Sequence, residues 1–532
     1  MDQSRLIYRV NPNSTSDNDG EKSSASNNSN IPEQAREDGK YEIQETDNYE
    51  ALGYSFSTIK KWTILSVIFI VQVSMNFNTS VYANAVTQLS EHFNVSEQAA
   101  RVPELTFLVL YAFGSELWAP WSEEYGRWII LQMSLFLVNI WQIPCALAPN
   151  YGTLVVCRAL GGLSSAGGSV TLGMVADMWE PNDQQYATAY VVLSSVGGSV
   201  VGGLVGGFIE TFLSWHWNFW IQLIFGGAVQ AIHFFVVPET RSTIMLKREA
   251  KRRRKAGEEN VYGPGELSNK SLNTKEIFAI WTRPFIMFAR EPIVLCLSLL
   301  SGFSDALIFT FLDSYTLVYA QWNFTVIDTS LALIPLIIGY LLAYLSFIPV
   351  IYSQQKLIHR DPDAFVPEER LWWLLFMAPL ETIGLFGFSW TSLGPPRVHW
   401  IAPMIFSTLV GAANYSIYMA TIDYMIASYG PYSASATGGN ALARDFLAGL
   451  ASIYSTPFYE YFKTYTLEYP STILACMAFA VTTPIYVFYW KGEVIREKSK
   501  FAQTLASERK ARGGHRALEL DEKYREQRIE TV

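Results

Sequence analysis

The sequence predicts an all-α membrane protein whose twelve transmembrane helices form two six-helix bundles. Three observations support this prediction: 50% of the 532 residues are hydrophobic, only 16% are charged, and long apolar runs alternate with short polar connectors. A transmembrane helix needs about 20 predominantly apolar residues. Twelve segments meet this requirement, six on each side of a polar central stretch, and they cover approximately residues 62–84, 103–121, 128–148, 152–177, 187–210, 217–238, 293–320, 328–352, 371–391, 399–426, 434–458 and 469–490.

Polar stretches divide the chain into five regions. The residues near the N-terminus are rich in Ser, Asn, Asp and Glu and show no hydrophobic periodicity, so we expect a disordered tail there. No apolar core follows a basic start near Met1, and the first transmembrane span would therefore act as the targeting signal. The predicted regions are a disordered cytosolic N-terminal tail over 1–58, an N-terminal bundle over 59–238, a cytosolic central loop over 239–290, a C-terminal bundle over 291–490 and a cytosolic C-terminal tail over 491–532.

Basic residues predict how these regions are oriented in the membrane. With twelve spans, the basic residues before the first span, in the central loop and after Trp490 all lie on one side. The opposite side then carries only Arg101, Arg397 and Lys463. Because cytosolic loops carry an excess of Lys and Arg, both termini and the central loop are expected to be cytosolic.

The central loop is expected to contain two helices. A basic run covers residues 244–256, and an amphipathic segment covers 274–290 after a Gly/Pro break at 263–265. A basic run beside a membrane would be held near anionic headgroups, whereas a solvated linker between the bundles is the simpler interpretation. The mixed charges of residues 498–528 indicate a solvated helix in the C-terminal tail.

Several short motifs lie at the ends of the predicted spans. The connector between the second and third spans, GSELWAPWSEEYGR, occupies residues 114–127 and joins two apolar runs through a turn-forming, charged segment. The motifs after it are CRALGGLSSAGG (157–168), VPETR (237–241), REPIVL (290–295), PEERL (367–371) and YGPYSASA (429–436). As an ordered set they resemble the fungal twelve-span drug:proton antiporters of the major facilitator superfamily, a branch that includes polyamine and multidrug exporters.

This resemblance implies a fold and a function. The fold would be two bundles related by a pseudo-twofold axis, around a central cavity that opens to each side of the membrane in turn. The function would be export of a small organic compound, such as a secondary metabolite, toxin or drug, across the plasma membrane or the vacuolar membrane. The proton gradient would drive export without a cofactor, and the partners of a monomer would be the solute, protons and membrane lipid, not nucleic acid. Polyamine export, facilitated diffusion or import of a nutrient, and a receptor-like role remain as alternatives.

No enzymatic activity is expected. The six histidines are scattered through the chain without the spacing of metal ligands. No Gly-rich phosphate-binding loop follows a strand pattern, so ATP-driven transport is not indicated.

Charged residues inside the predicted spans are candidates for proton coupling, because charge inside a membrane is costly. A carboxyl group between helices can load and release a proton as the cavity changes sides. Asp305 and Asp313 are eight residues apart, so both would lie on one seam of the seventh span. The resemblance associates the arginine of the fourth-span motif with proton coupling, and structural pairing is its alternative. For the acidic candidates the alternatives are exposure to water or structural pairing. The candidates are Arg158, Glu116, Asp305, Asp313, Glu381 and Asp423.

The resemblance also implies a conformational latch at the cytosolic ends of the second to fourth spans. In the family, an acidic residue at the end of the fourth span completes a charge cluster with the arginine of the preceding loop. Here the latch would consist of Glu123, Arg127 and Asp177. By stabilising one of two packings by a few kcal/mol, such a cluster shifts the balance between conformations.

The fifth span contains a dense run of glycines, VGGSVVGGLVGGF. Glycines on one helix allow either close packing or a bend. The run resembles the antiporter motif of drug:proton exchangers, although Gly203 stands where that motif usually has proline. The candidate residues of this motif are Gly202, Gly203, Gly206 and Gly207.

Polar and aromatic residues of the spans are candidates for contact with the solute. Amide groups inside a membrane must be satisfied internally, either by a solute or by a neighbouring helix. Aromatic faces suit planar or cationic organic solutes, although most such residues meet lipid or core. Because adjacent helix positions differ by about 100°, Arg444 is expected to pair with another span and not with Asp445. The candidates are Asn76, Asn78, Phe309, Tyr315, Tyr415, Tyr418, Asn440 and Arg444.

Two N-glycosylation sequons lie in short loops on the side opposite to the basic loops. They begin at Asn94 and Asn323. Both lie close to the predicted spans, so they are useful mainly as probes of topology.

Overall fold

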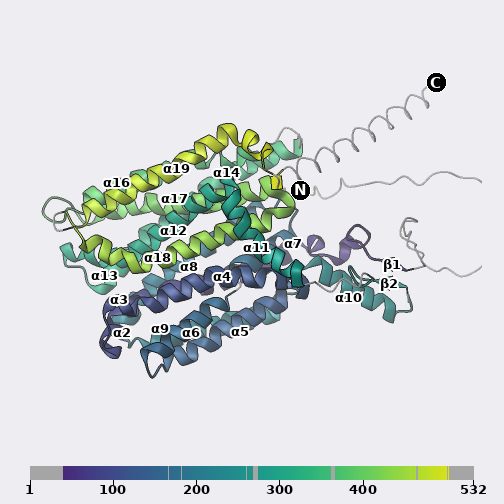
Figure 1. Ribbon diagram of the computed structural model, residues 1–532, viewed down its shortest axis with the longest axis horizontal. Coiled ribbons are helices and arrows are strands. Elements are labelled where there is room, and N and C mark those ends of the chain that lie inside the picture. Colours follow the sequence, from purple (N-terminus) through teal and green to yellow (C-terminus); the bar gives the residue numbers. More distant parts are fainter. Residues whose placement is uncertain are drawn as a thin grey trace, which may run out of the picture.

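The computed structural model describes residues 40–165, 167–180, 183–258, 260–267, 274–360, 366–462, 465–499 and 501–502. Within these residues the chain is helical apart from one two-stranded sheet. Two groups of long helices lie side by side, the N-terminal group in purple and blue and the C-terminal group in teal, green and yellow (Figure 1). The predicted residues 1–39 and 503–532 of the tails lie outside the described residues.

The N-terminal half begins at Thr58, where the side chain of Ser57 caps the first helix. Asn150 caps a later helix in the same way. Gly126, at φ 106°, makes the left-handed turn between two long helices. The helices of this half are α1 (Thr58–Ser80), η4 (Ala83–Ala85), α2 (Val86–Phe93), α3 (Glu97–Ala100), α4 (Val102–Tyr125), α5 (Arg127–Ala146), α6 (Tyr151–Leu163), α7 (Gly167–Met178), α8 (Gln185–Phe212) and α9 (His216–Val236).

The C-terminal half begins at Pro292, where proline suits the first turn of a helix. Its helices are α12 (Pro292–Tyr319), η5 (Ala320–Trp322), α13 (Val326–Leu331), α14 (Ile334–Arg360), η6 (Pro367–Leu371), α15 (Leu374–Met377), α16 (Pro379–Thr391), α17 (Ile401–Tyr429), η7 (Gly430–Tyr432), α18 (Ser433–Glu460) and α19 (Glu468–Glu497). Between the halves lie α10 (Ser242–Lys255), β2 (Val261–Tyr262) and α11 (Thr274–Arg290), close to the helices predicted for the central loop.

By length and composition, nine helical stretches of the described residues can cross a membrane. Three of the twelve predicted spans fall short of this standard. The span over 103–121 lies in α4, whose polar and aromatic residues lower its hydropathy; the span over 152–177 is divided between α6 and α7; and the span over 434–458 lies in α18, which is rich in small and polar residues. The count of twelve therefore stays a prediction.

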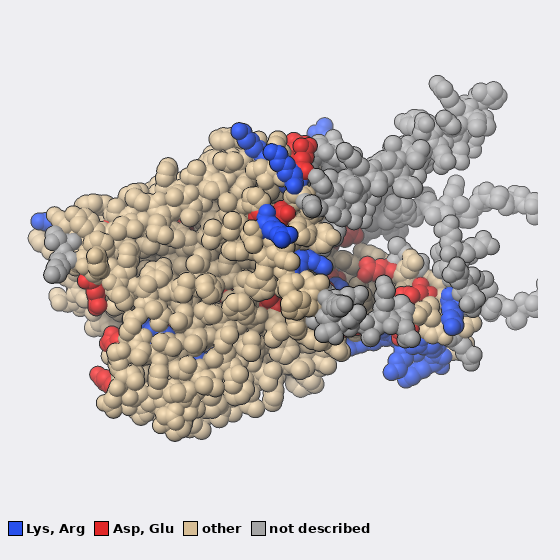
Figure 2. Space-filling view, in the orientation of Figure 1, with Lys and Arg blue, Asp and Glu red and all other residues tan. Residues whose placement is uncertain are grey.

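Charged side chains gather at the two ends of the molecule on the face shown in Figure 2. One end carries α10 and the small sheet, and we call it the α10 end; the opposite end carries α2, α3 and α13, and we call it the α13 end (Figure 1). The surface between the two ends is largely uncharged, as expected for a belt that faces lipid.

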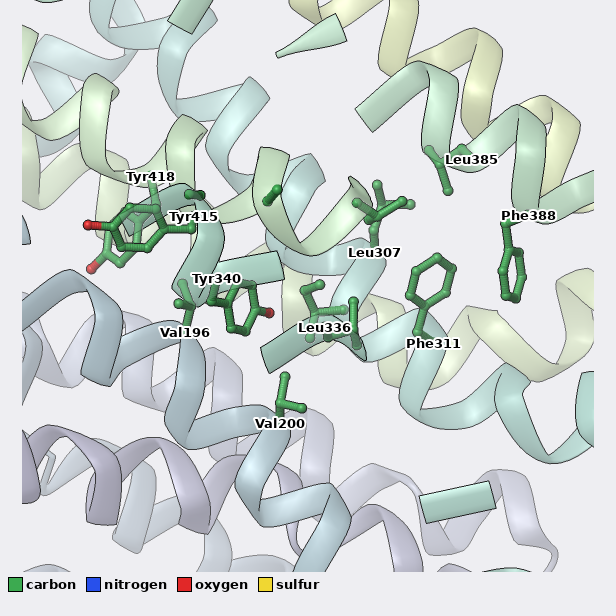
Figure 3. Packing of buried hydrophobic residues seen from close by; sticks show 14 of the residues in the cluster. Val196, Val200, Leu307, Phe311, Leu336, Tyr340, Leu385, Phe388, Tyr415 and Tyr418 are labelled. Carbon is green, nitrogen blue, oxygen red and sulfur yellow. The ribbon is translucent and has the colours of Figure 1, made fainter. Parts of the chain in front are cut away.

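A shared apolar core joins the two halves. Val196 and Val200 of α8 are buried in one cluster with Leu336 and Tyr340 of α14 (Figure 3). Helix α8 also packs against α13, and α4 packs against α18. The interface between the halves is therefore formed mainly by α4 and α8 on one side and by α14 and α18 on the other.

The glycines of α8 allow this close approach on two faces of one helix. A Cβ atom at Gly202 would lie 2.7 Å from the carbonyl oxygen of Phe77 in α1, and one at Gly206 would lie against Asn84. On the next face, Gly203 and Gly207 lie against residues of the C-terminal half, namely Leu312, Val326, Ser330 and Leu333. Since α8 is one helix from Gln185 to Phe212, these glycines serve close packing within and between the halves.

The N-terminal arm, defined as residues 40–57, is folded onto the central loop. Its strand β1 (Tyr41–Glu42) pairs in parallel with β2, and the short helices η2 (Thr46–Ala51) and η3 (Gly53–Ser55) follow. Arm and loop share a buried apolar cluster of Ile43, Leu52, Leu246, Ala250 and Val261. The disorder predicted for residues 1–58 is therefore wrong over 40–57, because the few apolar residues of the arm find partners about 200 positions away that composition cannot reveal.

The arm also contacts the N-terminal bundle. Tyr54 donates a hydrogen bond from its hydroxyl to the carbonyl oxygen of Ala176 at 3.2 Å. A Cβ atom at Gly53 would lie 2.7 Å from the carbonyl oxygen of Asp177, so glycine is required for this approach. Ser242 of α10 donates to Glu45 of the arm at 2.5 Å. The arm thus connects the central loop to the end of α7.

Replacing Leu52 with alanine is expected to release the arm. Leu52 is fully buried, and truncating a buried leucine costs about 2–5 kcal/mol. Since local opening controls proteolysis, cleavage within the arm of the detergent-purified protein is expected to become at least about tenfold faster. Glu50→Ala, at an exposed position of the arm, is the matched control. Equal cleavage rates for the two variants would show that the apolar cluster does not hold the arm.

Candidate functional site

A buried cluster of one arginine and two carboxylates lies near the middle of α12 and α18. Arg444 donates from Nε and Nη2 to Asp445 Oδ1 at 3.0 and 2.8 Å, and its Nε lies 3.8 Å from Asp305 Oδ2 of α12. The guanidinium carbon lies 4.2 Å from the centre of the Tyr418 ring, within the range of a cation–π contact. All three charged side chains are at most 16% exposed. We call Asp305, Arg444 and Asp445 the central cluster.

The structure corrects the expected isolation of Arg444 from its neighbour. Asp445 is the nearer carboxylate, and the interhelical contact with Asp305 is the longer one. The angle of about 100° between adjacent helix positions is bridged because the long arginine stem can turn its planar head sideways. The expected pairing with another span is also present, in the contact with Asp305. Arg444 therefore contacts both carboxylates, and the expectation of a single interhelical partner is incomplete.

Several polar atoms around the central cluster have no hydrogen-bond partner among the described residues. These atoms are Arg444 Nη1, Asp445 Oδ2 and both amide atoms of Asn440, one helical turn before Arg444. Asn440 is fully buried. Because unsatisfied buried polar groups are rare in proteins, atoms of this kind indicate a place for a solute or for ordered water.

Glu116 brings a further carboxylate from the N-terminal half to the same helix. It lies on α4 against Gly438 of α18, where a Cβ atom would be 2.6 Å from either carboxylate oxygen. Its Oε1 has no hydrogen-bond partner among the residues that the structure describes. Gly438 therefore provides the space for a carboxylate at the interface of the halves.

At the α13 end, an ion pair joins the two halves. Arg101, the residue before α4, pairs with Asp313 of α12, and both side chains are buried. Glu104, one turn further along α4, is 1% exposed and interacts electrostatically with Asp313, Arg101 and Arg158. Asp305 and Asp313 therefore do not share one seam: the first faces α18 of its own half, and the second reaches the opposite half.

Arg158 is held inside the N-terminal half. Its Nη1 donates to Asn78 Oδ1 at 2.9 Å, and its Cζ lies 4.0 Å from the centre of the Phe107 ring and 5.0 Å from that of Tyr82. The side-chain oxygen of Asn78, a candidate for solute contact, thus accepts a hydrogen bond from Arg158 of α6. Asn76 is also engaged, since its Nδ2 donates to the carbonyl oxygen of Gln72 at 2.9 Å. Both asparagines thus form hydrogen bonds between or within helices, and Asn78 Nδ2 has no hydrogen-bond partner among the described residues.

The predicted latch at the α10 end contains Arg127 and Asp177, whose Nε and Oδ2 lie 3.0 Å apart. Glu123 is exposed and lies outside this cluster, because the preceding residue, Ser122, faces inward and accepts from Arg127 Nη1 at 2.6 Å. Glu239 of the VPETR motif accepts from the backbone nitrogen of Arg127 at 2.9 Å, and Arg241 pairs with Asp177 at 3.4 Å. Apart from Glu123, the predicted residues therefore meet.

A second contact between the halves lies at the α10 end. Gln185, at the start of α8, donates to Asp423 Oδ2 of α17 at 2.8 Å and to Gln354 Oε1 of α14 at 2.9 Å. Asp423 also pairs with Arg370 at 3.2 Å. Asp423, predicted as a proton-coupling residue, thus takes part in a contact between the halves. Together with the pair of Arg101 and Asp313 at the α13 end, contacts between the halves are therefore present at both ends.

Glu381 is completely buried in the C-terminal half, away from the interface. It accepts a hydrogen bond from Ser304, whose oxygen also accepts from Asn414 Nδ2 at 3.2 Å. Glu381 Oε2 has no hydrogen-bond partner in the described part of the chain. Glu381 thus forms a polar contact within the C-terminal half that links α16, α12 and α17.

The aromatic candidates divide into two groups. Tyr418 covers Arg444 and is buried in the apolar cluster that joins α8 to the C-terminal half, and Tyr415 donates from its hydroxyl to the carbonyl oxygen of Ala189 in α8 at 3.0 Å, so both lie at the interface of the halves. Phe309 is buried with residues of α4 and α18 at the same interface. Tyr315 is different, because its hydroxyl donates to Ser407 at 2.7 Å within the core of the C-terminal half. Tyr315 is therefore a core residue in this conformation.

Sequence reasoning missed several residues that the structure places in these contacts, and four charged ones illustrate why. Arg101 and Glu104 lie at the edge of a span, where a charge costs little free energy because water is near. Arg101 served only to predict the orientation of the chain. Asp445 was discounted because of its neighbour, and Arg370 was seen only as part of the PEERL motif. One signal in the sequence could have found these residues. Each half carries a positively charged residue within or beside a membrane span, and such a charge needs a negatively charged partner nearby.

The fold and these clusters can now be compared with known proteins. A family model described as Major Facilitator Superfamily matches residues 68–453. The chain belongs to the major facilitator superfamily. The efflux pump atB of Aspergillus terreus is 32% identical over 72% of this chain and 81% of its own length, and the MFS-type transporter kojT of Aspergillus flavus is 31% identical over 84% of this chain and 80% of its own length.

A solved structure of a major facilitator protein has the same fold. The xylose transporter XylE from E. coli, in a partially occluded inward-open conformation, matches 82% of this chain and 98% of its own length with a TM-score of 0.56 at 16% identity. The family and the relatives are transporters, and the protein is accordingly a multi-pass membrane transporter and not an enzyme. Among the described residues, no group of three or more His, Cys, Asp or Glu side chains is arranged to hold a metal ion.

Proposed function

We propose that this major facilitator protein exports a small organic compound across the fungal plasma membrane in exchange for protons. The observation that carries the proposal is the composition of the central cluster. Asp305 and Asp445 supply two carboxylates, whereas Arg444 supplies one positive charge. A buried net charge is costly, so the cluster is stable in the closed protein when one of its carboxylates is protonated.

Exchange follows from the unpartnered oxygen of Asp445. Oδ2 accepts a hydrogen bond from a donor group of the solute best when it is ionised, whereas protonation makes it a hydrogen-bond donor and a weaker acceptor. Asn440 and Arg444 Nη1 offer further hydrogen bonds, and the Tyr418 ring lines the same place. Protonation of Asp445 would therefore weaken binding of such a solute, and this negative coupling between proton and solute is the condition for exchange.

The contacts between the halves supply the two gates. We propose that the α10 end faces the cytosol, as the basic residues of the central loop predict. The contacts of Gln185 with Gln354 and Asp423 would break when the cavity opens to the cytosol, and the pair of Arg101 and Asp313 would break when it opens outward. Movement of the halves about the central cluster would then carry solute and proton in opposite directions.

The direction of transport is proposed from the relatives. The Aspergillus terreus relative is named an efflux pump, and it is 32% identical to this chain. The central cluster contains more acid than base and lies beside an aromatic ring, which suits an organic solute with hydrogen-bond donors. A secondary metabolite, toxin or drug of this kind is the proposed substrate class. A monomer in the plasma membrane with both termini in the cytosol completes the proposal.

A two-stage experiment tests this proposal. Intracellular and secreted metabolites are first compared between a deletion strain of the source organism and its parent. The exported solute is expected to accumulate inside the deletion strain and to decrease in its medium. The purified protein is then placed in liposomes with an acidic lumen, and uptake of that solute and the lumenal pH are followed. Solute uptake with loss of lumenal protons is expected, and a protonophore should abolish accumulation.

Other outcomes distinguish the alternatives. Equilibration of the solute without a pH gradient would show a facilitator. Uptake driven by an acidic exterior would show proton-coupled import. If the deletion changes no metabolite but alters a response of the cell, the receptor-like interpretation gains support and the proposed export is contradicted.

A further inference from the structure

A cavity of about 610 Å³ lies at the α10 end, between the last turns of α14 and the segment of η6. We propose that this cavity binds the headgroup of an anionic aminophospholipid of the phosphatidylserine type. The proposal goes beyond the transport function, and it rests on the two chemically different sides of the cavity and on its position next to the lipid-facing surface.

One side of the cavity is apolar and continues the membrane surface of the protein. Pro349 and Val350 of α14 and Trp372, just after η6, line this side. On the same helix, Leu341 and Leu345 are 46% and 58% exposed in the belt that we assign to lipid. Tryptophan is favoured at the boundary between acyl chains and headgroups. A lipid whose chains lie along α14 would therefore bring its headgroup to this cavity.

Among the residues that the structure describes, the other side of the cavity carries two positive charges and one negative charge. Lys356 and Arg360 of α14 and Glu369 of η6 line it. A phosphatidylserine headgroup has the opposite pattern, with a phosphate, a carboxylate and an ammonium group. The two basic side chains complement the phosphate and the carboxylate, and Glu369 complements the ammonium group. Charge complementarity thus selects a headgroup that is anionic and also carries an amine.

The cavity adjoins the contact that closes the α10 end. Gln354, 8% exposed, lines the cavity and donates from Nε2 to the carbonyl oxygen of Glu369 at 2.8 Å. Its Oε1 accepts the hydrogen bond from Gln185 of the opposite half at 2.9 Å. A lipid that holds α14 against η6 would also hold Gln354 in the position that Gln185 requires. Bound lipid would therefore favour closure of this end.

Lipid binding can be tested without measuring transport. The full-length protein is placed in nanodiscs of phosphatidylcholine that contain a minor amount of phosphatidylserine or of phosphatidylglycerol, and the retained lipids are counted by native mass spectrometry. The wild-type protein is expected to retain phosphatidylserine in preference to phosphatidylglycerol, which is anionic but has no amine, and both in preference to phosphatidylcholine.

Two variants separate the charges of the cavity. Lys356→Ala with Arg360→Ala is expected to weaken retention of both anionic lipids by roughly tenfold or more. Glu369→Gln is expected to remove the preference for phosphatidylserine over phosphatidylglycerol. Arg290→Ala with Lys491→Ala removes two exposed basic residues that do not line the cavity, and it should retain lipids like the wild type.

Specific results would overturn the proposal. Equal phosphatidylserine retention by the wild type and the Lys356 and Arg360 double variant would exclude the cavity as the site. If the Arg290 and Lys491 control lost as much anionic lipid as the Lys356 and Arg360 double variant, retention would reflect a general attraction of lipid to basic residues. Equal retention of phosphatidylserine and phosphatidylglycerol by the wild type would refute the proposal that the cavity selects a headgroup with an amine. Size-exclusion chromatography of each variant shows whether it is folded before lipids are counted.

Discussion

Asparagine in place of Asp445 is expected to uncouple the solute from the proton gradient. The variant keeps an oxygen for the hydrogen bonds of Arg444 and leaves Arg444 with Asp305 alone, which is a neutral pair. No proton is then needed to balance the buried charge. At one-for-one exchange, a gradient of about 2 pH units supports roughly hundredfold accumulation, because each 1.4 kcal/mol is a factor of about ten. The accumulation ratio of the variant is expected to fall to about one.

Two measurements on the same liposomes check this expectation. Accumulation driven by the pH gradient should be lost, whereas exchange of labelled for unlabelled solute should continue at a higher solute concentration, because the amide nitrogen of asparagine replaces the oxygen that accepts from the solute. Asp305→Asn should behave alike, since it leaves the pair of Arg444 and Asp445. Glu91→Gln, at an exposed position of the α13 end, is the control and should accumulate like the wild type. Full accumulation by the Asp445 variant would remove the central cluster as the proton site.

Glutamine in place of Arg101 is expected to open the α13 end. The substitution leaves Asp313 and Glu104 buried without the arginine between the halves. Removing one partner of a buried ion pair costs about 3–5 kcal/mol, which here destabilises the closed conformation. A conformation open at the α13 end should gain population accordingly. The expected reporter is Gln98, which donates to the carbonyl oxygen of Ile453 across the halves at 2.6 Å.

Labelling of a cysteine at position 98 measures the opening. In a variant without the four native cysteines, a membrane-impermeant maleimide should label Gln98→Cys at least about tenfold faster when Arg101→Gln is also present. Arg397→Gln, at an exposed position, is the control. Exchanging the charges with Arg101→Asp and Asp313→Arg should restore slow labelling, because the pair is reformed in reverse. Fast labelling in the exchanged variant would show that the pair itself does not close this end.

Part of this architecture follows from the chain alone. Long apolar runs predict helices in lipid, since each must satisfy its own backbone hydrogen bonds there, and α1, α5, α8 and α12 begin and end close to the predicted limits. The pairing of Arg127 with Asp177, 50 positions apart, could be predicted because their motifs resemble those of the drug:proton antiporters. The sequence could not show that Glu123 lies outside the latch. Side chains at adjacent helix positions point about 100° apart, and the sequence does not show which of them points inward.

The partners of the buried charges were not predictable in the same way. Arg444 and Asp305 are 139 positions apart, and Arg101 and Asp313 are 212 positions apart, so no local pattern connects them. The arm shows the same limit, because Leu52 and Ile43 lie in a polar stretch and are buried only by α10 and β2. Composition reports the average of a segment, whereas burial depends on what the fold places beside individual residues.

The sequence by itself determined that this protein lies in a membrane, where its helices fall and which residues carry charge into them, because lipid imposes rules that a single segment must obey. Only the tertiary structure decided that Asp305 faces Arg444 while Asp313 faces the other half, that Asp445 adds a second carboxylate, and that the arm is folded. The reason is physical: hydrophobicity acts on each segment separately, whereas charge balance and close packing are properties of pairs that meet only after the helices assemble.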